Sequence, residues 1–476
     1  MKPVHEVSEG SVRPSGDGAT GGHTHTPSAG GETFRASHRG RVEMLGSLSL
    51  LAACLLAGGV LTGCGADASL GTLGQEERGR GQVNNKVIVD WIVHTDEVTS
   101  PNTPSNTPPR RSRTFAMVSV AMHDALNGIE SKYERYASPA SDPQASPVAA
   151  AAQAAHDVLV SLFQDRRDEL DAKLAASLGG VNDDEARARG IALGRAAAAA
   201  LLSARASDGS NVVVSYTPID QLGFWRPTPP AFAPALEPNW GNVTPWGLQS
   251  GSQFRSRAPY PLPSAEYAAD FTEVHDYGSA SSGIRSADQT SYALFWFEPS
   301  ANGWNRLART AVAIQPKNIW KTARMFALMN MALADGYIAS FDSKYVWQSW
   351  RPITFIPAPD DGNPATARDL SWVPLRPTPP IPDQTSAHTA AGFAARAALI
   401  EVFGDDPGNP MTMTSSTAVP VGSTRTWATF TQAAAENADS RVMVGIHTRQ
   451  SVVDGETQGR LVGDYVIGHR LRPLGN

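Results

Sequence analysis

Cysteine is nearly absent from this chain of 476 residues. Cys54 and Cys64 lie near the N-terminus, and no cysteine follows between residues 65 and 476. This distribution excludes disulfides, cysteine-bound zinc, iron–sulfur clusters and thiol catalysis from the body of the protein. An excess of positive charge is lacking too, because the formal net charge is -6. We therefore expect no nucleic-acid partner.

Strand signals are also scarce, and the best short candidate is residues 211–216. No internal repeat of fixed period is evident. Apolar residues at helical spacing dominate instead, which predicts an all-α body. Asn182 and Glu185 resemble a capping box at the start of one of these helices. The predicted helices include residues 115–129, 149–163, 186–206, 319–340 and 454–471.

The N-terminus differs from the body in composition. Residues 1–40 are rich in Gly, Ser, Thr and His and are expected to be a disordered extension. Residues 41–63 contain an apolar run that ends in Leu-Thr-Gly before Cys64, which resembles a bacterial lipobox. The resemblance implies a signal peptide, lipidation of Cys64 and export to the cell envelope, with the lipid as the only membrane attachment. An uncleaved anchor and a plain signal peptide are the alternatives. Residues 64–84 would be a linker.

A proline-rich segment at residues 216–264 is too long for an ordinary connection between helices. It carries Trp225, Trp240 and Trp246, whereas a flexible linker would carry fewer large apolar residues. We therefore predict an ordered loop packed on the helices.

Lys344 and Arg351 begin a series of three short clusters that carry chemistry. They are seven residues apart, so a helix would place both on one face, and Pro352 would close that helix. Two solvated surface cations would be the alternative for such a pair in isolation. The aromatic residues between them predict a partly buried segment instead.

Ser386, Ala387 and His388 form the second cluster, just before an alanine-rich stretch. Serine at this place is a typical helix N-cap, and a helix N-terminus with its free N–H groups favours anions. An ordinary cap with an incidental histidine is the alternative.

Arg441 and His447 form the third cluster. Six helical residues rotate a side chain by about 240°, so a continuous helix would point the two apart. Both can face one ligand if the helix ends near Gly445. A helix C-terminus with a dipole-stabilised histidine is the alternative.

Together the clusters offer three permanent cations, a hydroxyl and two histidines. Arginine and lysine donate to the oxygens of a compact tetrahedral oxyanion such as phosphate or vanadate. Histidine can serve as nucleophile, metal ligand or acid/base.

The order and spacing of these clusters resemble the shared signature of the vanadium-dependent haloperoxidases and the type 2 phosphatidic acid phosphatases: Lys-x6-Arg-Pro, Pro-Ser-Gly-His, Ser-Arg-x5-His. The similarity to the bacterial haloperoxidase-like branch covers roughly residues 85–470. It implies two packed four-helix-type bundles with long proline-rich loops. An N-terminal helical region at 85–284 would precede a catalytic domain at 285–476. The branch resemblance rests also on residues 121–127, 226–230, 245–246, 295–297 and 304–305.

The resemblance also implies a role for each residue of the clusters. Lys344, Arg351 and Arg441 would hold the equatorial oxygens of the anion, with help from Ser386 and the Ala387 N–H. His447 would be the apical vanadium ligand, or the nucleophile of a phosphatase. His388 would be the acid/base.

Five positions depart from the pattern. Thr385 and Ala387 replace the usual proline and glycine. Ser451 stands where the family usually has an aspartate that orients the last histidine, which leaves Asp454 and Glu456 as candidates for that role. Ile381 stands where haloperoxidases often carry an aromatic residue near the halide, and Phe341 occupies a second such position. A further hypothesis pairs Asp124 with an active-site arginine.

The leading functional hypothesis is a vanadium-dependent haloperoxidase-like enzyme, with vanadate as cofactor and hydrogen peroxide, halide and an organic acceptor as substrates. The first alternative is a phosphatase of the type 2 phosphatidic acid phosphatase superfamily, which would act on phosphomonoesters without a cofactor. The second alternative is a lipoprotein that binds phosphate without turnover.

Overall fold

Helices dominate the computed structural model, which describes residues 85–475 except residues 102, 104, 105 and 359. This described part contains thirteen α-helices and one two-stranded sheet, so the predicted all-α class is confirmed. All described residues belong to one compact unit, Ala68–Asn476. The predicted extension (1–40), signal segment (41–63), lipidated Cys64 and linker (64–84) lie outside the described residues.

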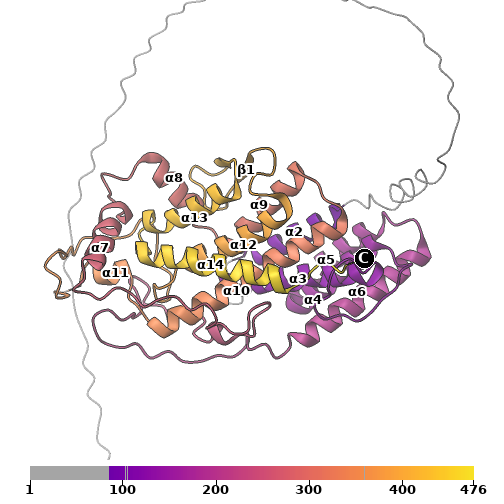
Figure 1. The fold of residues 1–476 in the computed structure, drawn as a ribbon, viewed down its shortest axis with the longest axis horizontal. Coiled ribbons are helices and arrows are strands. Elements are labelled where there is room, and N and C mark those ends of the chain that lie inside the picture. The colour runs from indigo at the N-terminus through magenta and orange to yellow at the C-terminus, as the bar shows by residue number, and fades with distance from the viewer. Residues whose placement is uncertain (1–84, 102, 104–105, 359, 476) are drawn as a thin grey trace, which may run out of the picture. The chain divides into compact units, whose positions relative to one another are not determined.

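A first group of helices precedes the proline-rich loop (Figure 1). Helix α3 packs against α4 and α6, and α4 also contacts α5. Alanine and leucine dominate the buried faces of α4 and α6, whereas α5 buries only Leu170. The group consists of α2 (Lys86–Thr99), α3 (Pro108–Ile129), α4 (Pro147–Leu162), η1 (Gln164–Arg166), α5 (Arg167–Leu178) and α6 (Asp184–Ala204).

The second group follows the loop and its short 3-10 turn, η2 (Trp240–Asn242). Helix α10 is its long central element and packs against α12 and α14, and also against α3 of the first group. Figure 1 shows α7 and α11 at the end of the unit away from α6. The members are α7 (Ala265–Gly278), α8 (Ala287–Phe295), α9 (Ser300–Ile314), α10 (Ile319–Trp347), α11 (Pro352–Phe355), α12 (Ala387–Phe403), α13 (Phe430–Met443) and α14 (Arg449–His469). The predicted domain boundary at residues 284 and 285 falls between α7 and α8 and stays a prediction.

The strand prediction at residues 211–216 is wrong, because this segment has no regular structure. The strands are β1 (Met411–Thr414) and β2 (Thr424–Trp427), which pair antiparallel in register Met411 with Trp427. The capping box predicted at Asn182 is also displaced. Asp183 is the N-cap of α6, and its carboxylate accepts from the Ala186 N–H at 3.0 Å.

The loop at 216–264 packs on the helices through its tryptophans, as predicted. Trp225, Trp240 and Trp246 are each at most 2% exposed. Asp335 in α10 holds the loop by accepting three backbone N–H bonds, from residues 246, 247 and 248, at 2.7, 2.7 and 3.0 Å. The loop also pairs with the chain after α10: the Trp350 N–H donates to the Gly223 carbonyl at 3.0 Å. This pairing fixes the backbone immediately before Arg351.

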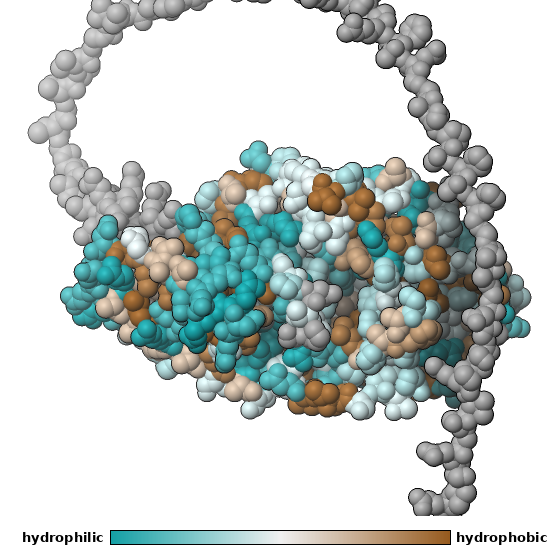
Figure 2. Space-filling model, turned by 180° about the vertical axis from the view of Figure 1, so that it is seen from behind, coloured by the Kyte–Doolittle hydropathy of each residue, from teal (hydrophilic) through white to brown (hydrophobic). Residues whose placement is uncertain are grey.

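Hydrophilic residues cover a broad area over one end of the face in Figure 2, and hydrophobic residues there form small separate groups. Among the residues that the structure describes, no helix combines the length and apolar character that crossing a bilayer requires.

Candidate active site

The cationic clusters come together from four helix ends. Lys344 lies in the last turn of α10, and Arg351 is the N-cap of α11. Arg441 lies in the last turn of α13, and His447 follows in the turn before α14. The side chains of Lys344, Arg351 and Arg441 are at most 2% exposed, and His447 is 4% exposed.

The single helix predicted for Lys344 and Arg351 is wrong. Helix α10 ends at Trp347, because Gln348 takes a left-handed conformation with φ 49° and ψ 33°. Glycine usually occupies this place, so the sequence carried no stop signal. Both cations still reach the site, one from the end of α10 and the other after the turn.

The predicted end of the helix near Gly445 is confirmed. Helix α13 ends at Met443, and Gly445 has φ +83°. A Cβ at this position would lie 2.3 Å from the Gly278 carbonyl oxygen, so both the conformation and the space require glycine. The resulting turn brings His447 back toward Arg441.

Lys344 is held by two backbone carbonyl groups. Its Nζ donates to the Pro382 and Asp383 oxygens at 2.8 Å each. An ammonium group has three donors, so one hydrogen remains for a ligand. Burial lowers the pKa of Lys344 well below its usual value, and the neighbouring charge of Arg351 lowers it further.

The two arginines are only partly satisfied. Arg351 Nε donates to the Ile381 carbonyl at 2.8 Å and its Nη1 donates to the Ile446 carbonyl, but its Nη2 has no partner. Arg441 Nη1 donates to the Trp296 carbonyl at 2.9 Å, and its Nε has no partner. Burial lowers the pKa of Arg351 to about 10 and that of Arg441 to about 9. Buried N–H groups without acceptors are costly, so the site is incomplete without an anion.

His447 presents one ring nitrogen to the site. Its Nδ1 contacts the Asp383 carboxylate closely and lies 3.1 Å from Ser451 Oγ. Because a carboxylate accepts, Nδ1 carries the hydrogen and Nε2 keeps its lone pair, which Arg351 Nη1 approaches at 3.2 Å. Burial lowers the pKa of His447 well below its usual value, and the charges of Arg351 and Lys344 add to this effect. The neutral ring therefore has the protonation state of a metal ligand or nucleophile.

His388 is fixed through its other nitrogen. Its Nε2 lies 2.8 Å from the Glu298 carbonyl oxygen, which can only accept, so Nε2 carries the hydrogen and Nδ1 is the free acceptor. Burial lowers the pKa of His388 well below its usual value, followed by the charge of Arg441. The Glu298 carboxylate is itself held by Arg306 at 2.8 Å and by Ser416.

Ser386 caps α12, as predicted. Its Oγ accepts from the Thr389 N–H at 3.4 Å and from the Thr389 hydroxyl at 3.0 Å, so its own hydrogen is left to donate. Ala387 is the first residue of the helix, where the N–H has no intrahelical acceptor. The positive end of the α12 dipole thus adds to the three cations.

Asp124 and Asp454 lie elsewhere, which corrects the expectations for both. The Asp124 carboxylate accepts from the N–H groups of residues 136, 137 and 138 at 2.7, 2.7 and 2.9 Å, so it holds the chain after α3 and contacts no arginine. Asp454 pairs with Arg257 at 2.8 Å and accepts from Gln384. It has no contact with His447.

Asp383 is the functional residue that the sequence motifs did not single out. Its Oδ2 accepts from the Thr448 N–H at 3.3 Å and from the Thr448 hydroxyl at 3.1 Å, while its Oδ1 contacts His447. The available signal was its place three residues before Ser386, next to the second cluster. Asp383 also lines a pocket of about 250 Å³ whose wall includes Tyr260, Tyr267, Trp347, Trp350 and Phe355.

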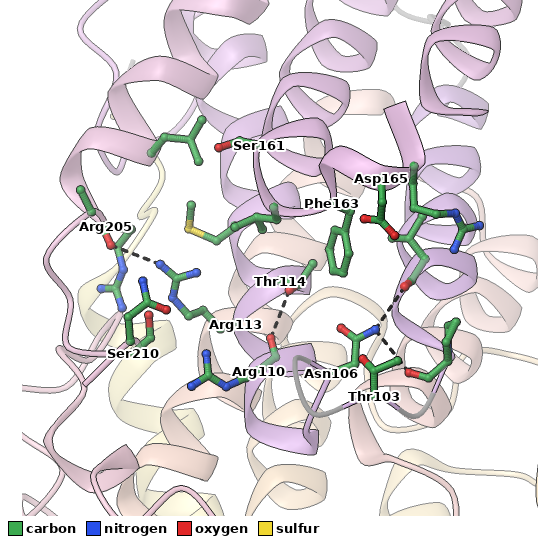
Figure 3. Close-up of a pocket in the computed structure, with 18 residues that line it drawn as sticks. Thr103, Asn106, Arg110, Arg113, Thr114, Ser161, Phe163, Asp165, Arg205 and Ser210 are labelled. Carbon is green, nitrogen blue, oxygen red and sulfur yellow. Dashed lines mark hydrogen bonds between the residues drawn. The ribbon is translucent and has the colours of Figure 1, made fainter. Parts of the chain in front are cut away.

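A different pocket, of about 560 Å³, lies among the first group of helices (Figure 3). None of the predicted site residues lines it. Its arginines are paired: Arg113 and Arg205 share Asp208 at 2.7 and 3.0 Å, and Arg110 pairs with Glu237. It therefore lacks the unsatisfied donors of the cationic site.

The helical fold thus carries a buried cationic site whose free donors suit an oxyanion. Residues 324–475, which contain all three clusters, match the family model described as the VCPO second helical-bundle domain. The chain is 25% identical over 189 residues to a vanadium chloroperoxidase from Curvularia inaequalis, a match that spans 33% of this chain and only 31% of that relative.

Solved structures extend the likeness beyond this segment. A bacterial vanadium-dependent iodoperoxidase superposes with a TM-score of 0.72 at 28% identity, covering 83% of this chain and 98% of that one. A holo bacterial vanadium-dependent chloroperoxidase shares the fold with a TM-score of 0.61 at 17% identity, covering 77% of this chain and 92% of that one. The chain is thus similar to vanadium-dependent haloperoxidases in the sequence of its C-terminal part and in its fold.

Proposed function

We propose that this protein is a vanadium-dependent haloperoxidase that oxidises halide with hydrogen peroxide. The observation that carries the proposal is the incomplete cationic site. Arg351 Nη2 and Arg441 Nε are buried donors without acceptors, and they lie in the same cluster as Lys344 and a neutral His447. Such a set fits an oxyanion with several charged oxygens and one position for a nitrogen ligand.

Vanadate fits this donor set. Lys344, Arg351 and Arg441 would hold its equatorial oxygens together with the Ser386 hydroxyl and the Ala387 N–H, and His447 Nε2 would be the metal ligand. When bound, vanadate supplies a Lewis-acidic metal that activates peroxide toward halide. The protein's own contribution is electrostatic: donors that are already oriented and sheltered from water.

His388 would move the proton. Its Nδ1 is the free acceptor, because Nε2 donates to the Glu298 carbonyl. The pKa of His388 is lowered by burial, so the ring is neutral at neutral pH and can accept a proton from a bound oxygen. The halide and the organic acceptor would be small molecules that reach the site near His388.

The test supplies two substrate sets to the full-length protein. One reaction contains orthovanadate, hydrogen peroxide and bromide or iodide with a halogenatable dye, and the other contains an aryl phosphate without vanadium. His388→Ala is the site variant. His94→Ala is the matched control, because His94 lies on α2 and pairs with Glu97 outside the site. We expect vanadate-dependent halogenation that falls at least about a hundredfold in His388→Ala and stays unchanged in His94→Ala.

Phosphate release without halogenation would refute the haloperoxidase proposal and favour a phosphatase with His447 as nucleophile. Anion binding without turnover of either substrate set would favour a phosphate-binding protein. The lipid anchor at Cys64 and the export of the chain are separate proposals. Incorporation of a labelled fatty acid into the wild type but not into Cys64→Ala would test them.

A further inference from the structure

Asp383 contacts three groups of the cationic site. Its carboxylate receives the His447 Nδ1 hydrogen through Oδ1, and Oδ1 lies 3.7 Å from Arg351 Nη1. Its backbone oxygen accepts from Lys344 Nζ at 2.8 Å. Its own N–H donates to the Ser349 carbonyl at 2.9 Å. The residue is 3% exposed, so water does not compete for these bonds.

Ser451 lies on the same nitrogen but is a weaker acceptor. It stands four residues after His447, on the first turn of α14, and its Oγ is 3.1 Å from Nδ1. The Ser451 hydroxyl donates its hydrogen to the Asp383 backbone oxygen at 3.0 Å. A neutral oxygen of this kind orients a ring less firmly than a carboxylate, since hydrogen bonds to an ionised acceptor are about twice as strong.

The backbone of α14 therefore presents position 451 at the distance from which a carboxylate could reach His447. The chain places serine there and supplies the carboxylate from residue 383, which is 64 residues before His447. The two segments also touch through their backbones, because the Ser386 N–H donates to the Ser451 carbonyl at 2.9 Å. A carboxylate at position 383 or at position 451 could thus accept the hydrogen of His447 Nδ1.

We propose that Asp383 is a positioning residue that fixes the tautomer and the orientation of His447, so that Nε2 faces the anion. The inference rests on the proposed function for the use of Nε2, but the tautomer itself exists without any ligand. The Asp383 carboxylate has no hydrogen to donate to an anion. Asp383 acts through the imidazole, and its backbone carbonyl holds Lys344 whatever the side chain is.

The experiment compares the full-length wild type with Asp383→Asn, Asp383→Ala and Asp383→Ala/Ser451→Asp. Asp124→Asn is the matched control, because Asp124 is equally buried and accepts three backbone N–H bonds far from His447. Three quantities are measured: the tautomer of His447 by long-range ¹⁵N NMR, with His447→Gln to assign the signal; the Kd for orthophosphate by calorimetry; and the Tm.

In Asp383→Ala we expect the Nδ1-protonated form to lose its dominance and orthophosphate to bind about 10–100-fold more weakly. Asp383→Asn, whose amide oxygen can still accept, should lie between this variant and the wild type. The double variant should regain the wild-type tautomer and most of the affinity, because the carboxylate introduced by Ser451→Asp would face the same nitrogen. Asp124→Asn should lower the Tm and leave the tautomer and the Kd unchanged.

A rescue of this kind separates positioning from a general loss of structure, since the double variant carries more changes than the single one. The proposal is overturned if Asp383→Ala, with its fold intact, keeps both the wild-type tautomer and the wild-type Kd. It is also overturned if Asp383→Asn keeps them while Asp383→Ala does not fold. A wild type that binds no orthophosphate or vanadate would defeat the proposed function instead, and the tautomer comparison would still decide the role of Asp383.

Discussion

Two pairs of arginines differ in how completely the protein satisfies their hydrogen-bond donors. In the first pair, Arg113 and Arg205 share the Asp208 carboxylate at 2.7 and 3.0 Å. Arg205 also donates to the Thr244 and Pro245 carbonyls and lies 4.1 Å over the Trp246 ring. In the second pair, Arg351 and Arg441 each keep a buried nitrogen atom without a hydrogen-bond partner. The first pair shares a protein carboxylate, whereas the second pair keeps buried donors that no protein group accepts from.

The pKa shifts express the same difference. Burial alone would raise the pKa of Asp208, but Arg113 and Arg205 outweigh burial and hold that pKa below its usual value. In the second pair, burial lowers the pKa of Arg351 although the Asp383 carboxylate opposes the shift. Burial also lowers the pKa of Arg441, and the charge of Arg351 lowers it further. We therefore expect the ion pairs around Asp208 to stabilise the fold, and the incompletely paired charges of Arg351 and Arg441 to lower the stability of the ligand-free protein.

Removal of the shared carboxylate should have the largest effect. Asp208→Ala leaves the buried Arg205 and the half-buried Arg113 without their anion, which we expect to lower the free energy of unfolding by about 3–5 kcal/mol. The measurement is urea denaturation of the full-length protein, with orthophosphate binding in parallel. The Kd should stay within about twofold of the wild type, because Asp208 does not contact the cationic site. A Kd that changed as much as the stability would mean that the two regions are not independent.

Removal of a site cation should act in the opposite direction. Arg441→Met replaces an incompletely paired buried cation with an apolar side chain of similar length. We expect the ligand-free protein to gain about 1–3 kcal/mol and to bind orthophosphate at least about a hundredfold more weakly. Wild-type protein at a ligand concentration of about 100 Kd should gain about 2.7 kcal/mol, a gain that the variant lacks.

The control for this change is Arg205→Met, which makes the same substitution in the pair of arginines that shares Asp208. Arg205→Met should lower the stability of the ligand-free protein and leave its response to orthophosphate intact. A loss of ligand-free stability in Arg441→Met would contradict the comparison, because it would mean that the protein already satisfies this arginine.

Features with local causes could be predicted from the sequence. The N-cap at Ser386 and the turn at Gly445 depend on residues within a few positions, and the structure has both. The alanine- and leucine-rich helices follow from side-chain periodicity in the same way. The orientation of the second and third clusters therefore follows from the residues that immediately surround them.

Features with distant causes could not be predicted. The contact between Asp383 and His447 joins residues 64 positions apart, and no periodicity encodes it. Gln348 ends α10 in a left-handed conformation that its side chain does not favour, because the pairing of residues 348–350 with residues 223–225 holds the backbone there. Asp124 matched the need for a carboxylate by charge alone, and only the fold shows that it holds residues 136–138.

The smallest expected effect concerns Asp270, a buried carboxylate near the site. Its pKa is shifted in the opposite direction to that of Asp208. Asp270 on α7 accepts from the Gln450 N–H at 2.9 Å, and burial raises the pKa of Asp270 to about 6, with added repulsion from Asp383 and Glu273. A raised pKa means that the folded state prefers the protonated acid. The contribution of Asp270 to stability is therefore full below about pH 4 and is lost as the pH rises through about 6. Asp208 behaves in the reverse way, since its contribution is lost only as the pH falls below about 4.

Asp270→Asn keeps the acceptor for Gln450 and removes the charge. We expect the variant to exceed the wild type by about 1–3 kcal/mol at about pH 8, and the difference to close as the pH falls toward about 4. Urea denaturation at about pH 4.5, 6 and 8 measures it, with Asp208→Asn as the control whose deficit should persist from about pH 8 to about pH 6. A constant difference between Asp270→Asn and the wild type at all three pH values would show that the charge of Asp270 is not the cause. Asp270 and Asp208 would then differ in packing alone. The contrast between the two regions would rest only on the hydrogen-bond partners of their arginines.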